Sequence, residues 1–237
     1  MISDSAFKKI TGLRHDFPKL DDRGALLIPT SFKLKDLEFM KYRHLPVNWK
    51  IDAVTQDDLP EEFSPEAVNI VDLFRRKTVD LDYEVMLIFD YKTAKLIYCF
   101  VNDFNGGDEV KGIVDGELLS NHYVAIIHNH PRDYGCPPSS KNFQILDLDF
   151  QNYELISSFE ELWIIESKCH IDDVDSIKDH IHNLYRSARE INEEKFHDDE
   201  EIFSKTNELY GELILNYINN LNSNIKITKR SFYNEFN

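Results

Sequence analysis

Two histidines, His128 and His130, stand one residue apart at the end of the apolar run Ala125-Ile126-Ile127. Side chains alternate between the two faces of a strand, so residues i and i+2 point the same way. Two imidazoles in this arrangement can bind one metal ion, and zinc is commonly bound by histidine nitrogens. The spacing therefore predicts a metal site at the mouth of a strand, where α/β folds often place their sites.

The same spacing recurs at His180 and His182, but inside a segment that reads as a helix over residues 172–191. Residues i and i+2 of a helix are separated by about 200° of rotation, so these two imidazoles cannot share an ion. We interpret this second pair as surface histidines. The first pair remains the candidate site.

A short loop after the first pair brings two more polar residues into consideration. Pro137-Pro138-Ser139 leads into a predicted helix over residues 139–150, for which Ser139 is a good N-cap. Asn142 then lies in the first turn and leans back toward the strand end. We expect Ser139 and Asn142 to lie close to the two histidines.

The elements that must position these residues alternate between strand and helix patterns. Ser64, Pro65 and Glu66 supply an N-cap, a first-turn proline and a first-turn acid for a helix over residues 64–77. Apolar runs bounded by polar turns predict strands over residues 83–89, 96–101, 124–129, 153–157 and 162–166. The expected fold is α/β, with a mixed sheet and flanking helices.

The last third of the chain has a helical pattern. Apolar residues recur at spacings of three and four in two stripes, one from Val174 to Ile191 and one from Phe203 to Leu221. The simplest interpretation is a helical hairpin packed on the core, with a partner-binding or dimerising surface as the alternative. We therefore divide the chain into an N-terminal segment, a core and a C-terminal helical extension, at residues 1–78, 79–169 and 170–237.

Composition limits the partners and the compartment. The chain has 43 Asp and Glu against 27 Lys and Arg, and a formal charge of −16 repels nucleic-acid phosphates and anionic membranes. Cys99, Cys136 and Cys169 cannot all pair within the chain, which favours a reducing setting. The sequence shows no signal peptide and no apolar run of about 18 residues. We expect a soluble, cytoplasmic protein that binds neither nucleic acid nor a membrane.

The stretch from His128 to Asn142 resembles the motif of the JAB1/MPN/Mov34 (JAMM) metalloenzymes, in which His-x-His-Pro is followed by Ser-x-x-Asp and preceded far upstream by a glutamate. The residues Ile127-His128-Asn129-His130-Pro131 are similar to the motif in the RadC-like branch, which occurs in bacteria and mobile elements. The resemblance covers roughly residues 80–168. It implies a JAMM core similar to that of cytidine deaminases, and a zinc-dependent hydrolase that cleaves a peptide or isopeptide bond of a protein or peptide substrate.

The resemblance also implies a ligand set. His128 and His130 would bind Zn²⁺, and the third ligand would be Asn142, where the family has an aspartate. An amide oxygen is neutral and a poorer zinc ligand than a carboxylate, so Cys136 or Asp133 remain alternative third ligands. The loop before the serine is one residue longer than in the family.

Two further roles are carried over by position. Ser139 would bond the water or the oxyanion. Glu84 would be the acid/base, because the family's glutamate also opens a strand before the motif; Glu109 and Glu117 are its rivals. Zinc with an open coordination position lowers the pKa of water to about 7, and a nearby carboxylate can carry the proton to a leaving amine.

Asn142 motivates a second interpretation, a JAMM-fold binding module that has lost catalysis and docks a protein partner through its C-terminal helices. A third interpretation is association with nucleic acid, by analogy with the RadC name alone. The charge of −16 argues against it.

Overall fold

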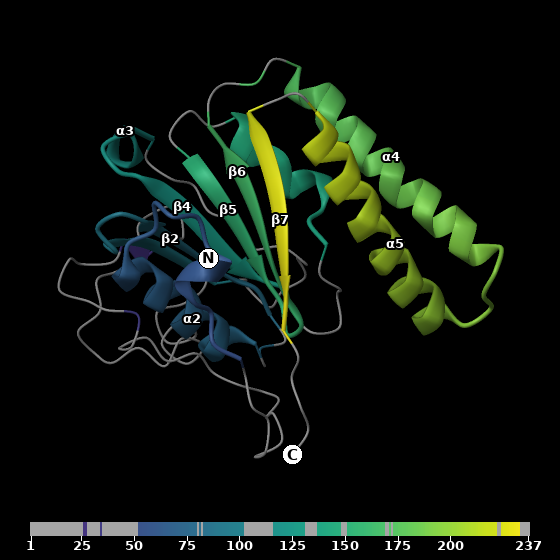
Figure 1. Cartoon of the computed structure of the whole chain (residues 1–237), viewed down its shortest axis with the longest axis horizontal. Coiled ribbons are helices and arrows are strands. Elements are labelled where there is room, and N and C mark those ends of the chain that lie inside the picture. The colour runs from purple at the N-terminus through teal and green to yellow at the C-terminus, as the bar shows by residue number, and fades with distance from the viewer. Residues whose placement is uncertain are drawn as a thin grey trace.

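Seven strands form one mixed sheet in the part of the chain that the computed structural model describes, in the order β1-β3-β2-β4-β5-β6-β7 (Figure 1). The described residues are 26–27, 34, 52–79, 81, 83–101, 116–130, 137–147, 151–168, 171, 173–221 and 224–232. The strands are β1 (Leu26–Leu27), β2 (Val85–Asp90), β3 (Leu96–Val101), β4 (Val124–Asn129), β5 (Gln151–Ser157), β6 (Glu161–Ser167) and β7 (Ile225–Ser231). Neighbours are antiparallel except β4 and β5, which are parallel. The predicted mixed α/β class is confirmed.

Strand β4 lies in the middle of the sheet, and all six of its residues are buried. It pairs with β2 on one side and with β5 on the other, and the side chains on both of its faces are buried, as its continuous apolar run predicts. His128 is opposite Met86 of β2 and Ile156 of β5. The end of β4 therefore meets the start of β2 and the end of β5 at one edge of the sheet.

Helix α2 (Pro65–Thr78) covers one face of the sheet. The Ser64 hydroxyl oxygen accepts the Ala67 N–H at 3.2 Å, and Pro65 occupies the first turn, as the sequence predicted. The buried side chains of α2 share one core with alternate residues of the strands, among them Leu87, Phe89, Ala125, Ile127, Leu155 and Ile164. This face holds the odd-numbered residues of β4.

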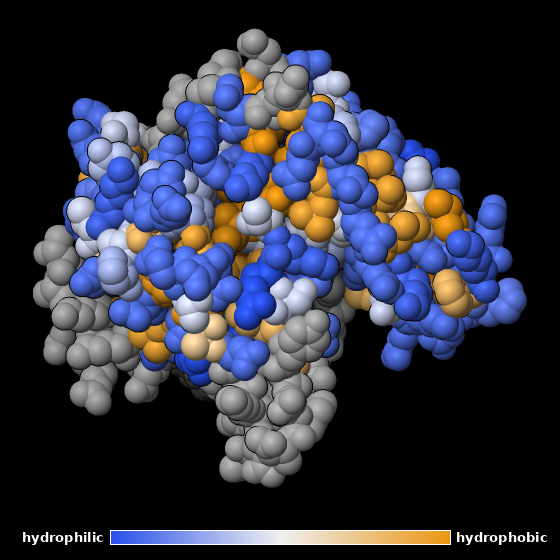
Figure 2. Space-filling view, viewed as in Figure 1, coloured by the Kyte–Doolittle hydropathy of each residue, from blue (hydrophilic) through white to orange (hydrophobic). Residues whose placement is uncertain are grey.

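On the opposite face, a hairpin of two long helices, α4 (Val174–Glu193) and α5 (Asp199–Asn220), covers the part formed by β5, β6 and β7 (Figure 1). On the part formed by β2, β3 and β4, a separate apolar cluster includes Leu119 of the short helix α3 (Gly116–Leu119). The core of the hairpin includes Ile156, Trp163 and Ile165 of the sheet, which confirms the predicted helical hairpin. Ile191 and Phe203 were expected in its buried stripes, but they are 41% and 37% exposed because they lie near the tip of the hairpin. Apolar residues are visible among hydrophilic ones over this hairpin in Figure 2.

Strand β7 was not predicted. It pairs with β6 and alternates buried Ile225 and Ile227 with exposed Lys226 and Thr228. The side-chain amide of Asn219 bonds both the carbonyl and the N–H of Ile227, at 3.0 and 3.2 Å. Residues 170–237 are therefore more than a helical extension, because they also complete the sheet.

Three short helices complete the described ranges: η2 (Gln56–Asp58), α3 (Gly116–Leu119) and η4 (Ser140–Asp147). The sequence predicted a longer helix over 139–150 where the structure has the 3₁₀ helix η4. Three residues per turn place Phe143 and Leu146 above one another, and both are buried in the core of the hairpin. Within the described ranges, no helix is both long and apolar enough to span a membrane.

Candidate metal centre

The two histidines at the end of β4 meet as the strand pattern predicts. His128 is 5% exposed, and the N–H of His130 donates to the Ser157 carbonyl at 2.8 Å, which continues the pairing with β5. The Nε2 atoms of the two imidazoles are 3.3 Å apart. Two ligands of a tetrahedral zinc ion, each about 2.0–2.1 Å from it, are about 3.3 Å apart. The spacing of these histidines therefore fits zinc.

Asn142 lies next to these two histidines, but the amide nitrogen of its side chain, not the oxygen, faces His128. Its Oδ1 accepts the backbone N–H of Ser139 at 2.7 Å and the Ser139 hydroxyl at 3.1 Å, while its Nδ2 is 3.2 Å from Nε2 of His128. A backbone N–H can only donate, so Ser139 fixes which end of the carboxamide is oxygen. The predicted third ligand is thus in place, but its oxygen reaches a metal only after the carboxamide rotates and releases Ser139.

The turn that carries Ser139 and Asn142 is anchored by the helical hairpin. The hydroxyl of Tyr210 on α5 donates to the Pro138 carbonyl at 2.7 Å, and this contact is buried. A Cβ added at Gly211 would lie 3.2 Å from the Trp163 ring and 3.5 Å from Pro137, so α5 and this loop are closely packed. The hairpin therefore helps to hold the turn beside the histidines.

Glu84 lies at the same edge of the sheet, directly before β2, and is 9% exposed. Met86 is opposite His128, so the same register continued by two residues places Glu84 beside His130. Asn129 secures this position, because its amide donates to the Tyr83 carbonyl at 2.9 Å and accepts the Val85 N–H at 2.7 Å. The middle residue of the histidine motif thus holds the backbone on both sides of Glu84.

A buried carboxylate that the sequence analysis did not identify stands behind His128. Oε1 of Glu154 is 2.8 Å from Nδ1 of His128, and Oε2 accepts a hydrogen bond from Nε2 of Gln151 at 2.6 Å. Glu154 is 7% exposed and Gln151 is 3% exposed. A charged residue within the apolar strand run from Tyr153 to Ser157 was the available signal, because a buried carboxylate needs a partner.

The sequence also offered alternatives to Glu84 as acid/base and to Asn142 as third ligand. Glu117 is exposed on α3, before the start of β4, and is therefore at the opposite end of that strand from the histidines. Glu109, Asp133 and Cys136 lie outside the described residues. Among the residues that the structure describes, no three His, Cys, Asp or Glu side chains are grouped so that they could hold a metal ion. Two histidines and a carboxamide are what this part of the chain offers.

The second histidine pair behaves as expected. His180 and His182 are both exposed on α4, and the His180 ring stacks on Tyr217 with the ring centroids 4.0 Å apart. Neither contributes to the site on β4.

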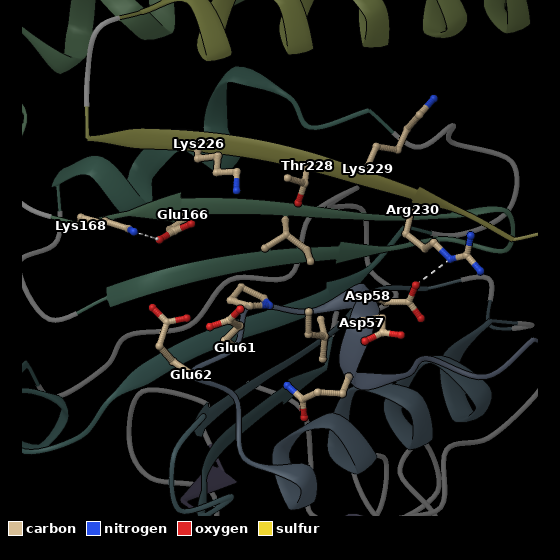
Figure 3. Close-up of a pocket in the computed structure, with 14 residues that line it drawn as sticks. Asp57, Asp58, Glu61, Glu62, Glu166, Lys168, Lys226, Thr228, Lys229 and Arg230 are labelled. Carbon is tan, nitrogen blue, oxygen red and sulfur yellow. Dashed lines mark ion pairs between the residues drawn. The ribbon is translucent and has the colours of Figure 1, made fainter.

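A separate groove of about 1090 Å³ lies on the other face of the sheet (Figure 3). Residues 57–62 form an acidic side and basic residues of β7 the other, and Arg230 and Asp58 form an ion pair at 2.8 Å. Its lining includes Ile164, which belongs to the core under α2, whereas His128 is aligned with Ile156 and Trp163 on the hairpin side. The groove is therefore not part of the metal centre.

Comparisons of the chain with protein-family models, with curated proteins and with solved structures found no match.

Proposed function

We propose that this protein is a zinc-dependent hydrolase of the JAMM type, which cleaves a peptide or isopeptide bond in a protein or peptide substrate. The observation that supports it most is the 3.3 Å separation of the Nε2 atoms of His128 and His130, which matches two ligands of one tetrahedral zinc ion. The placement of Glu84 and Ser139 at the same edge of the sheet adds the remaining parts of the motif.

Each residue has a definite role in this proposal. His128 and His130 hold the zinc, and Asn142 is the third ligand once its carboxamide has rotated. Zinc bound in such a site supplies hydroxide at neutral pH. Glu84 accepts the proton of the attacking water and donates it to the leaving amine, so that one amide bond and one O–H bond break while an acid and an amine form. The exposed Ser139 donates a hydrogen bond to the oxyanion.

A second candidate function is a protein-binding module with this fold and no catalysis. It is favoured by Asn142, whose Nδ2 faces Nε2 of His128 while its oxygen is held by Ser139. This arrangement satisfies the amide and the imidazole without a metal. The exposed apolar residues Ile191 and Phe203 at the tip of the hairpin would then contribute to the partner surface.

Zinc content tests the first candidate. We expect about one zinc per chain in protein purified after growth in zinc-rich medium, and loss of that zinc in His128→Ala. His182→Ala is the matched control, because it removes an exposed histidine from the other His-x-His pair and should retain the zinc. Absence of zinc from the unmodified protein would refute the hydrolase proposal.

Asn142→Asp then separates the two functions. Cleavage is followed with fluorogenic peptides and with a glycine-to-lysine isopeptide substrate. Loss of hydrolysis in the variant means that the amide belongs to a working site. A large gain in zinc retention and hydrolysis means that the natural site is degenerate, and it supports the binding module.

A further inference from the structure

We propose that Glu154 supplies, from behind His128, the negative charge that Asn142 does not bring to the metal centre. This inference rests on the proposed zinc site and concerns how this particular chain can bind a dication there. With Asn142 as third ligand, all three ligand side chains would be neutral, so the charge of the ion would be uncompensated by its direct ligands. The carboxylate of Glu154 is one imidazole ring away from that position.

The contacts of Glu154 direct its charge toward His128. One carboxylate oxygen lies 2.8 Å from Nδ1 of His128, and the other accepts the Gln151 amide at 2.6 Å. The Gln151 nitrogen also donates to the Tyr153 carbonyl at 3.3 Å, which fixes the orientation of the amide. The cross-strand neighbours of Glu154 are Ile126 and Ile165, both apolar.

The contacts of His128 determine which of its two ring nitrogens carries the proton. Nδ2 of Asn142 can only donate, and it lies 3.2 Å from Nε2 of His128, so the lone pair of the neutral ring is on Nε2. The ring proton is then on Nδ1, the nitrogen that lies 2.8 Å from the Glu154 carboxylate. Carboxylates in this position orient metal-binding histidines and make them more basic. Glu154 is thus a positioning residue that acts through His128.

Burial makes a purely structural role for this charge costly. A carboxylate that is 7% exposed loses most of its hydration, which is unfavourable unless its partners compensate. Glutamine would fill the same volume without that penalty, but its single oxygen could accept from only one of His128 and Gln151. A carboxylate at this place serves both donors and directs its charge toward the imidazole.

The test measures the affinity of the apoprotein for Zn²⁺ by competition with a chromogenic chelator. We expect Glu154→Gln, which keeps the shape and removes the charge, to weaken zinc binding 10- to 100-fold. Glu166→Gln is the matched control: Glu166 is also in the sheet and 9% exposed, but it pairs with Lys168 at the groove, and we expect unchanged affinity.

A double-mutant cycle identifies charge as the cause. Because either carboxylate can compensate the ion, Asn142→Asp should raise the affinity more in the Glu154→Gln background than in the natural chain. Equal gains in both backgrounds would overturn the inference. So would a Glu154→Gln variant that binds zinc as tightly as the unmodified protein.

Two readouts keep the outcomes distinct. If the unmodified protein binds no zinc, the proposed function fails and this inference fails with it, whereas zinc binding that is insensitive to Glu154 overturns this inference alone. Should Glu154→Gln fail to fold, ¹⁵N NMR of the unmodified apoprotein decides. His128 protonated on Nδ1 supports the inference, and His128 protonated on Nε2 overturns it.

Discussion

Asn129→Ala tests the link between the histidine motif and the strand that begins after Glu84. The side chain of Asn129 is 1% exposed and makes two hydrogen bonds, one from its amide to the Tyr83 carbonyl and one from the Val85 N–H to its oxygen. Tyr83 and Val85 are themselves buried, at 3% and 0% exposed. Alanine would leave one backbone acceptor and one backbone donor without these bonds, away from water.

The expected loss of stability follows from the Tyr83 carbonyl and the Val85 N–H, which both lose a hydrogen bond. A buried polar group that loses its partner costs about 1–3 kcal/mol, so two such groups are expected to lower the free energy of unfolding by about 2–6 kcal/mol. That is a large part of the roughly 5–15 kcal/mol that stabilises an ordinary domain. Urea unfolding followed by far-UV circular dichroism measures the difference.

Asn121→Ala is the matched control. Asn121 also donates to a backbone carbonyl, that of Glu117 at 3.0 Å, but it is exposed. Water replaces its bond, so we expect a change within about 0.5 kcal/mol. If Asn129→Ala were as mild as this control, Asn129 would not hold the backbone around Glu84 in solution, and the placement of Glu84 would lose its main support.

Three further predictions concern other parts of the chain. Tyr210→Phe removes the hydroxyl that donates to the Pro138 carbonyl, and we expect it to lower the free energy of unfolding by about 1–2 kcal/mol. Tyr123→Phe changes an exposed ring and should alter that free energy by no more than about 0.5 kcal/mol. Equal urea midpoints for the two variants would contradict the anchoring of the loop by Tyr210. Burial raises the pKa of the Cys99 thiol to about 12, so roughly one thiol in ten thousand is ionised at pH 8, and peptide mapping after iodoacetamide should find Cys99 modified only in urea. Burial alone would raise the pKa of the Asp90 carboxyl, but hydrogen bonds from backbone N–H groups and from the His122 side chain outweigh burial and lower the pKa below its ordinary value of 3.8. The stabilisation by this carboxylate is therefore complete above that pH and is lost as the pH falls through the lower folded value. Asp90→Asn should flatten the acid limb of a curve of stability against pH, and a limb of unchanged slope would be the contrary result.

The sequence predicted those parts of the fold that follow from local rules. Strand alternation brought His128 and His130 to one face, and capping at Ser64 placed the start of α2. The helical stripes predicted the hairpin but not its length beyond the sheet, which leaves Ile191 and Phe203 exposed. Which part of an amphipathic stripe is covered depends on the size of the sheet beneath it.

The features that were missed depend on contacts between distant segments. Glu154 meets His128 because β5 is parallel to β4 in one particular register, and a single sequence does not specify that register. β7 was missed because its exposed face is lysine and threonine and its buried face has only two isoleucines. The orientation of Asn142 depends on the Ser139 N–H, which spacing alone does not reveal.

The most direct test of the metal centre is an anomalous difference map from crystals of the zinc-loaded protein, recorded at the zinc absorption edge. The proposed function predicts one peak about 2.0–2.1 Å from Nε2 of both His128 and His130, with the Asn142 carboxamide rotated away from Ser139. A map without that peak, in which Nδ2 of Asn142 still faces Nε2 of His128, would contradict it.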